Sequence, residues 1–367
     1  MIAEQSTVEV KWTRADADAA DFVFFDTWAE PFVIEGNCAQ GMAEKRFLRI
    51  PESLFPHVND GVVNMAGCCA GICIRFVTDS PSVAVSAEIP SSSYRHHFAP
   101  RGAEGLDVYA GPRGAHVFCQ AVGPMEEDEA TIQNVANSPL HVGAALQPWT
   151  VYLPIYGGCK SVSIGVKKGS RLEAPPPHTV KDPVLFYGSS ITQGGCASRA
   201  GLVYTHIVTR KLDCGMVNLG FSGSAKGETA MAEYIAQQPM AAFVFDYDHN
   251  AGIAHLRDTH KPFFDIIRAA QPDLPIVMMS RCDFEEDAAG GIRRAIIYRT
   301  WEQARSKGDT RVWFVDGEKL FGTTDRDACT VDGCHPNDIG FMRMAEALQP
   351  TLHEALICKM TGGWVIP

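Results

Sequence analysis

The sequence lacks the long apolar stretches that membrane proteins need. No segment approaches the roughly 18 to 20 uninterrupted apolar residues of a membrane-spanning helix, although 46% of the 367 residues are hydrophobic. That composition is typical of a soluble globular protein. We therefore expect no membrane partner, and at this length we expect two domains of about 150 to 200 residues each.

Positive charge is also scarce. The chain has 32 basic and 43 acidic side chains and a formal net charge of −11. Because no basic run offsets this charge, phosphate backbones would be repelled, and we expect no nucleic-acid partner. The segment Met1–Trp12 lacks the basic start and apolar stretch that export signals share, which favours a cytoplasmic location.

Paired cysteine motifs are absent too. The 12 cysteines are scattered along the chain and do not form the dense framework of a disulfide-bonded scaffold. The closest groups are Cys68 and Cys69 with Cys73, and Cys329 with Cys334. They lack paired C-x-x-C spacing, so we interpret them as small buried hydrophobic residues. We expect neither disulfides nor structural zinc.

The first half of the sequence is rich in short strand patterns separated by turn residues. These patterns occupy residues 72–77, 82–86, 117–119 and 161–166. Their spacing predicts a β-sandwich. The proline-rich stretch 173–183 is expected to be a linker, because proline can continue neither a helix nor a central strand. The predicted domains are 1–178 and 179–367.

In the second half, apolar runs alternate with longer helical patterns. The runs that predict strands are residues 184–187, 216–219, 242–245, 276–279 and 312–315. Alternation of strands and helices predicts a parallel sheet, and runs without polar residues fit strands covered on both faces. We expect a three-layer α/β domain whose ligand site lies at the carboxyl ends of the strands.

Small residues follow the first of these strands, over Gly188–Gly195. They permit a tight turn from strand to helix and leave a hydroxyl at a helix N-terminus. A serine in this position can be a nucleophile, but Ser189, Ser190 or Thr192 can equally serve as a helix cap. Neither G-x-G-x-x-G nor G-x-x-x-x-G-K-[ST] is present, so nucleotide binding is not favoured.

Polar turns follow the next two strands. A glycine of Asn218–Ser224 could aim its N–H at a developing oxyanion, and the asparagine that ends Asp246–Asn250 could add a side-chain donor. Each segment is also compatible with an ordinary turn. Asp246, Asp248 and His249 could instead hold a metal, but their positions on one loop fall short of a complete ligand set. We therefore expect no metal.

Near the end of the chain, Asp332 precedes His335 by three residues, directly before a helical pattern over 339–356. A carboxylate at this spacing can accept a hydrogen bond from one ring nitrogen and leave the other basic towards a serine hydroxyl. Alone, the pattern is more typical of a helix N-cap beside a solvated histidine. Combined with the serine-bearing turn, it favours a serine activated by a histidine over a simple helix cap.

Taken in order, these segments resemble the four blocks of the SGNH, or GDSL-like, hydrolase superfamily, which carry a serine, a glycine, an asparagine and a histidine. Gly-Ser-Ser stands where the family often has Gly-Asp-Ser, so Ser190 matches the nucleophile and Ser189 replaces the acid. Gly223 matches the oxyanion glycine, with Gly220 as the second choice. Asp-His-Asn replaces the usual Gly-x-Asn, and Asn250 matches the third donor.

The fourth block matches through Asp332 and His335. The resemblance therefore implies a catalytic triad of Ser190, His335 and Asp332. It also implies an oxyanion hole formed by the backbone N–H groups of Ser190 and Gly223 and by the Asn250 side chain. No cofactor is implied.

The first half resembles the β-rich N-terminal domain of a two-domain subset of these enzymes, through Gly105–Tyr109 and Val151–Tyr156. This resemblance implies a jelly-roll-like β-sandwich before a flavodoxin-like catalytic domain, as in bacterial carbohydrate acetylesterases. The implied activity is removal of small acyl groups, mainly acetyl, from small-molecule or oligosaccharide esters.

Two alternatives remain, a short-chain lipid or thioester acylhydrolase and a non-catalytic glycan-binding protein. Assembly into a homo-oligomer also stays open, because no stretch of the sequence marks a subunit contact.

Overall fold

The computed structural model describes residues 6–14, 19–90, 96–112, 114–125, 130–282 and 288–362. The chain forms two compact units. Unit 1 comprises Met1–Arg49, Gly67–Pro177 and Ser198–Gly201, and unit 2 comprises Ile50–Ala66, His178–Ala197 and Leu202–Pro367. The division of the chain into an accessory domain 1–178 and a catalytic domain 179–367 stays a prediction.

Unit 1 consists mainly of two antiparallel sheets. One sheet has the order β1-β9-β4-β7, and the other has the order β10-β3-β8-β5-β6 with β2 paired to β3. The strands and α-helices among the described residues of this unit are β1 (Phe22–Asp26), β2 (Val33–Glu35), α1 (Ala39–Glu44), β3 (Cys73–Thr78), β4 (Ser82–Glu88), α3 (Pro100–Glu104), β5 (Leu106–Ala110), β6 (Val117–Val122), β7 (Thr131–Asn137), β8 (Gln147–Tyr152), β9 (Ser161–Lys167) and β10 (Leu172–Glu173).

Side chains from both sheets form one apolar core in unit 1. Phe76 and Trp149 from one sheet and Val85 and Ile164 from the other belong to a single buried cluster, and each has an exposed fraction of 0%. Alternate residues of a strand point to opposite faces, so one face of each sheet can supply this core. The antiparallel β-rich region expected for the first half is confirmed.

Unit 2 contains a parallel sheet with the order β12-β11-β13-β14-β15. Counted in chain order, this is the 2-1-3-4-5 arrangement of flavodoxin-like folds. The strands and α-helices are α2 (Asp60–Asn64), β11 (Val180–Gly188), α4 (Ser190–Gln193), α5 (Tyr204–Leu212), β12 (Cys214–Gly220), α6 (Thr229–Ala236), β13 (Ala242–Asp246), α7 (Ile253–Ala270), β14 (Ile276–Met279), α8 (Ala288–Ser306), β15 (Val312–Val315) and α9 (Asp338–Met360). The expected α/β domain with a parallel sheet is confirmed.

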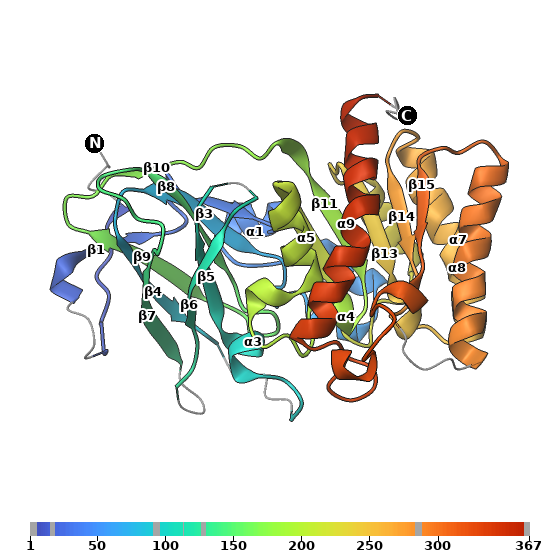
Figure 1. Ribbon diagram of the computed structural model, residues 1–367, viewed down its shortest axis with the longest axis horizontal. Helices are drawn as coiled ribbons and strands as arrows, with labels where there is room; N and C mark the ends of the chain where they lie inside the picture. Colours follow the sequence, from blue (N-terminus) through green and yellow to red (C-terminus); the bar gives the residue numbers. More distant parts are fainter. Residues whose placement is uncertain are drawn as a thin grey trace. The chain divides into compact units, whose positions relative to one another are not determined.

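Helices cover both faces of this sheet (Figure 1). On β11, Phe186 packs against Tyr204 of α5, which stacks on Phe341 of α9. The next residue, Tyr187, stacks on Phe263 of α7. Because neighbouring residues of a strand point to opposite faces, α5 and α9 lie on one face and α7 on the other.

Strand β11 begins inside the stretch that the sequence analysis treats as a linker. It starts at Val180 and includes Pro183. The pairing of β11 with β12 shifts register between Val180 and Val184. Proline cannot donate a ladder hydrogen bond, and such an irregularity is one of the few places in a strand where it is tolerated.

A short segment from the first half of the sequence belongs to unit 2 because its contacts are there. Asn59 caps α2 by accepting hydrogen bonds from the N–H groups of Gly61 and Val62. The amide of Asn59 donates to the Ser224 carbonyl at 2.8 Å and to the Glu228 carboxylate at 2.5 Å. These contacts are far apart in sequence, so local patterns did not predict them.

Among the residues that the structure describes, no helix is long and apolar enough to cross a membrane. All 12 cysteines lie in the described part of the chain and are free thiols, and most of them are buried. Cys68, Cys69, Cys73 and Cys329 are among the buried ones, which agrees with their interpretation as small hydrophobic residues.

Candidate active site

The first candidate residue lies where β11 turns into α4, in a segment that we call the serine turn (Gly188–Gly194). Ser189 is the N-cap of α4, and its Oγ accepts a hydrogen bond from the Ile191 N–H at 3.2 Å. Gly194 ends the helix in the left-handed conformation, with φ of 114°. Of the serines and threonine that could have capped this helix, Ser189 does so, and the Ser190 hydroxyl is available for other contacts.

The structure brings the predicted triad residues together. Ser190 Oγ lies 2.9 Å from His335 Nε2, and His335 Nδ1 lies 2.8 Å from Asp332 Oδ2. When Nδ1 carries the ring proton, it donates a hydrogen bond to the carboxylate. The unprotonated Nε2 can then accept a hydrogen bond from the serine hydroxyl. This arrangement can take a proton from an alcohol.

Hydrogen bonds hold Asp332 in its ionised form. The other carboxylate oxygen, Oδ1, accepts from the backbone N–H groups of His335 at 2.7 Å and Cys334 at 3.0 Å. Partial burial opposes ionisation, but these hydrogen bonds and the one from the His335 ring outweigh it, so the pKa of Asp332 lies below its ordinary value. A negative charge therefore faces the imidazole at neutral pH.

The second element of the site is the histidine loop (Thr330–Asn337), which lies directly before α9. The Val331 N–H donates to the His335 carbonyl at 3.0 Å, closing the loop on itself. Asn337 caps α9 by accepting from the N–H groups of Ile339 and Gly340, and its amide donates to the Ala328 carbonyl at 2.7 Å. Short-range hydrogen bonds thus shape the loop.

Gly220, which ends β12, and Gly223, in the turn that follows, differ in what their N–H groups do. The Gly220 N–H donates to the Asn218 side chain at 2.8 Å. Gly223 adopts φ of 68°, and no partner among the described residues takes its N–H. Of the two candidates, Gly223 is the one whose N–H is available, which favours the first choice from sequence.

Asn250 is tied to the same turn. Its side-chain amide donates to the Phe221 carbonyl at 3.0 Å, and this carbonyl also accepts from the N–H groups of Ser224 and Ala225. An amide NH₂ group has two hydrogens, so one can still serve a ligand. The assignment of Gly223 and Asn250 to an oxyanion hole stays a prediction.

The acidic residues considered as metal ligands have separate partners in the structure. The Asp246 carboxyl accepts hydrogen bonds from the hydroxyls of Thr192 and Tyr204. Asp248 Oδ2 accepts from the Arg281 N–H at 3.0 Å, and burial raises the pKa of Asp248 to about 6. Both carboxyls therefore have roles in holding the fold.

His249 lies against cysteines. Its Nε2 is 3.9 Å from Cys282 Sγ, and its Nδ1 is 3.8 Å from Cys334 Sγ. Burial, reinforced by the positive charges of Arg281 and other neighbours, lowers the pKa of His249 to about 3. The ring is therefore neutral and links the turn that carries Asn250 to the histidine loop.

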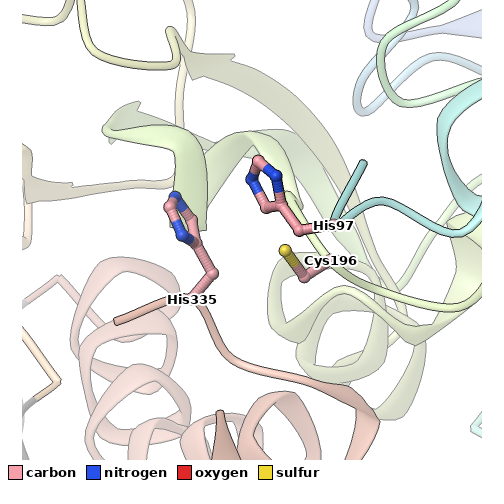
Figure 2. Close-up of side chains that lie close together, drawn as sticks. All are labelled: His97, Cys196 and His335. Atoms are coloured by element: carbon pink, nitrogen blue, oxygen red, sulfur yellow. The ribbon is translucent and has the colours of Figure 1, made fainter. Parts of the chain in front are cut away.

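Cys196 is a neighbour of the site that the sequence analysis did not identify. Its Sγ lies within 4.8 Å of a ring nitrogen of His335, and both side chains are drawn in Figure 2. Burial, with a contribution from the Asp332 charge, raises the pKa of this thiol to about 12. Cys196 is therefore a neutral thiol. Only its place shortly after Ser190, in a glycine-rich segment, could have pointed to it.

Comparisons with family models match both halves of the chain. Residues 181–353 match the model of the GDSL-like Lipase/Acylhydrolase family. Residues 22–172 match the model for the N-terminus of SGNH hydrolase-type esterases. No curated protein matches the chain.

Solved structures of similar fold cover nearly the whole chain. A protein from Bacteroides ovatus described as a GDSL-like lipase is 26% identical, with a TM-score of 0.79 over 92% of this chain and 98% of that one. The salicylyl-acyltransferase SsfX3 of a tetracycline biosynthetic pathway is 19% identical, with a TM-score of 0.72 over 91% and 98%. A family two carbohydrate esterase from Clostridium thermocellum, in complex with cellohexaose, is 15% identical, with a TM-score of 0.56 over 81% and 95%. The last two likenesses concern the fold alone.

Proposed function

The chain belongs to the SGNH, or GDSL-like, hydrolase superfamily and is an ester hydrolase, and from this premise we propose that it removes acetyl or other small acyl groups from carbohydrate esters, mainly oligosaccharides. One observation carries the proposal. The Ser190 hydroxyl lies 2.9 Å from His335 Nε2, while Asp332 contacts the other ring nitrogen. These three side chains supply a nucleophile, a base and an orienting negative charge.

In the proposed reaction, Ser190 Oγ attacks the ester carbonyl carbon while His335 Nε2 accepts the hydroxyl proton. Asp332 stabilises the imidazolium that forms. As the tetrahedral intermediate collapses, His335 returns the proton to the leaving sugar oxygen, and the acyl group stays on Ser190. Water then attacks the acyl-enzyme with His335 again acting as base, which releases the carboxylic acid and restores the serine.

The developing oxyanion would be stabilised by the backbone N–H groups of Ser190 and Gly223 and by the Asn250 amide. The available N–H of Gly223 and the hydrogen bond from Asn250 to the neighbouring Phe221 carbonyl support these assignments. Loss of one such donor typically raises the barrier by about 3 kcal/mol.

The carbohydrate part of the proposal is supported by the fold shared with the family two carbohydrate esterase whose structure holds cellohexaose. The preference for a small acyl group rests on the sequence, in which no long apolar lid segment is apparent.

A second candidate is a short-chain lipid or thioester acylhydrolase on the same scaffold. The likeness to the Bacteroides ovatus protein described as a GDSL-like lipase favours it. The two candidates differ in acyl length, because an enlarged acyl pocket would gain binding energy from each added methylene.

The test combines an acyl series with natural substrates. Hydrolysis of 4-nitrophenyl acetate, butyrate and octanoate should be fastest for acetate. Incubation with acetylated xylo-, manno- and gluco-oligosaccharides should release acetate, as followed by mass spectrometry. Ser190→Ala should abolish both activities. Rates that rise with acyl length would favour the lipid hydrolase, and turnover that survives in Ser190→Ala would refute the proposed mechanism.

A further inference from the structure

A buried polar cluster lies beside the serine turn and has no part in the proposed chemistry. Asp246 ends β13, and its Oδ1 accepts a hydrogen bond from the Thr192 hydroxyl. The Tyr204 hydroxyl lies 3.2 Å from Asp246 Oδ2 and 3.3 Å from the Thr192 oxygen. The exposed fraction is 4% for Asp246 and 0% for Thr192 and Tyr204. The three side chains are therefore shielded from water.

Each member of this cluster is attached to an element that carries a part of the site. Thr192 lies in α4, two residues after Ser190. The Tyr204 ring, at the start of α5, stacks on Phe341 with the ring centroids 6.3 Å apart. Phe341 belongs to α9, the helix that follows His335. Asp246 thus contacts the helix of the serine directly and the helix after the histidine through one aromatic ring.

Burial favours the uncharged form of the Asp246 carboxyl. Burial raises its pKa well above the ordinary value, with a further contribution from the nearby Asp248 charge. The hydrogen bonds from Thr192 and Tyr204 act in the opposite direction but do not outweigh burial. A neutral carboxyl group can both donate and accept hydrogen bonds, as a carboxylate cannot.

The glycine that starts the serine turn is required by this cluster. A Cβ on Gly188 would overlap both Asp246 Oδ1 and Thr192 Oγ1. On another side, the Asn218 amide donates to the Thr192 carbonyl at 2.7 Å. Helix α4 is therefore held by side chains from β12 and β13.

We propose that Asp246 is a positioning residue, whose carboxyl keeps Ser190 at its distance from His335 by acting as a hydrogen-bond hub for Thr192 and Tyr204. The inference rests on the proposed function, because it concerns the geometry of that reaction. A misplacement of about 1 Å at a reacting group can lower a rate by about 10²-fold. Loss of the hub should therefore lower kcat and leave KM nearly unchanged.

The experiment measures two rates in Thr192→Val, Asp246→Asn and Asp246→Ala. The first is turnover of 4-nitrophenyl acetate, and the second is covalent labelling of Ser190 by a fluorophosphonate, which does not depend on the substrate. Thr192→Val and Asp246→Ala should lower kcat and the labelling rate by about 10- to 100-fold with KM within about 2-fold. Asp246→Asn should stay within about 5-fold of the wild type, because an amide of the same size can still hydrogen-bond to both hydroxyls.

Thr300→Val is the matched control. It removes a hydroxyl with an exposed fraction of 3% that contacts His260 at 2.9 Å between α7 and α8. It should leave kcat and the labelling rate unchanged. A general loss of activity on removal of any buried hydroxyl would contradict the inference.

Wild-type rates in folded Thr192→Val would overturn the proposal. So would an Asp246→Asn variant that loses as much activity as Asp246→Ala, since the hub would then depend on charge. If Asp246→Ala fails to fold, as judged by circular dichroism, the other two variants decide the outcome. Turnover that survives in Ser190→Ala refutes the proposed function, whereas its loss there with normal rates in Thr192→Val refutes only this inference.

Discussion

The serine turn and the histidine loop bring their catalytic candidates to within 2.9 Å of one another, yet they are built differently. The exposed fractions of Ser189, Thr192 and Gln193 in the serine turn are 0%. In the histidine loop, the side chains of Asp332 and His335 are 36% and 21% exposed. Side chains from two strands, β12 and β13, hold the serine turn, whereas mostly local hydrogen bonds shape the histidine loop. Substitutions that enlarge a residue packed against the turn should therefore damage the fold, whereas those of exposed side chains in the loop should mainly affect the chemistry.

The largest expected effect on kcat in this comparison comes from a substitution in the histidine loop. Asp332→Asn should lower kcat by about 10⁴-fold, the size of the corresponding loss in serine proteases, because the imidazolium loses its stabilising charge. The free energy of unfolding should fall by only about 1 kcal/mol, because an amide oxygen can still accept from the N–H groups of Cys334 and His335. Steady-state kinetics and urea denaturation measure the two quantities. Near-normal turnover would remove Asp332 from the mechanism.

A glycine beside the serine turn should have the largest effect on stability. In Gly220→Ala, the new Cβ would overlap the backbone nitrogen of Gln193 and stand 2.6 Å from its Cα, so we expect a loss of about 3 kcal/mol in the free energy of unfolding.

Gly223→Ala is the matched control for this substitution, because a Cβ there would have no atom of the described residues within 4 Å apart from its own chain neighbours. It should cost only about 1 kcal/mol, through its left-handed φ. Equal losses in both variants would show that the serine turn can relax.

Acid should lower the free energy of unfolding through His260, a buried histidine that packs on β13. His260 stacks on Phe245 of β13 with the ring centroids 4.7 Å apart, and burial lowers its pKa to about 3. The unfolded chain, with a histidine pKa of about 6.5, then binds more protons than the folded one below that pH. Stability contributed by the neutral ring is complete above pH 6.5 and is lost as the pH falls towards 3.

His260→Gln removes this contribution. The slope of unfolding free energy against pH, measured by urea denaturation between about pH 6 and 4, should fall by about 1.4 kcal/mol per pH unit. Thr300→Val should leave the slope unchanged, because burial and not the hydrogen bond lowers the pKa. An unchanged slope in His260→Gln would contradict the assignment.

The smallest effects are expected from removing the helix caps of α4 and α9. Ser189→Ala and Asn337→Ala should each cost about 1 kcal/mol in the free energy of unfolding. Their effects on kcat should differ, because α4 is also held through Thr192, whereas Asn337 anchors the histidine loop. We expect a change within about 2-fold for Ser189→Ala and a loss of about 10-fold for Asn337→Ala. Equal kcat values would remove the distinction between the two elements.

Local patterns in the sequence predicted much of the fold and the site. The runs 242–245, 276–279 and 312–315 lie within β13, β14 and β15, because buried parallel strands are continuously apolar. The segments that carry the triad candidates were selected because parallel strands end at one edge of a sheet, and the order of the family blocks then assigned Ser190, Asp332 and His335. Pro183 misled the prediction, since a register shift in β11 accommodates it.

The sequence by itself determined the period of the strands and helices, because this period depends on residues close together in the chain. It also determined the serine, glycine, asparagine and histidine blocks. Each block is a short local pattern, and their order along the chain indicates the family. Only the tertiary structure decided that Asn59 packs in unit 2 and that Asp246 meets both Thr192 and Tyr204. The partners in these contacts come from separate elements. Buried polar groups need hydrogen-bond partners, and which groups become buried together depends on the tertiary fold and cannot be read from a local sequence pattern.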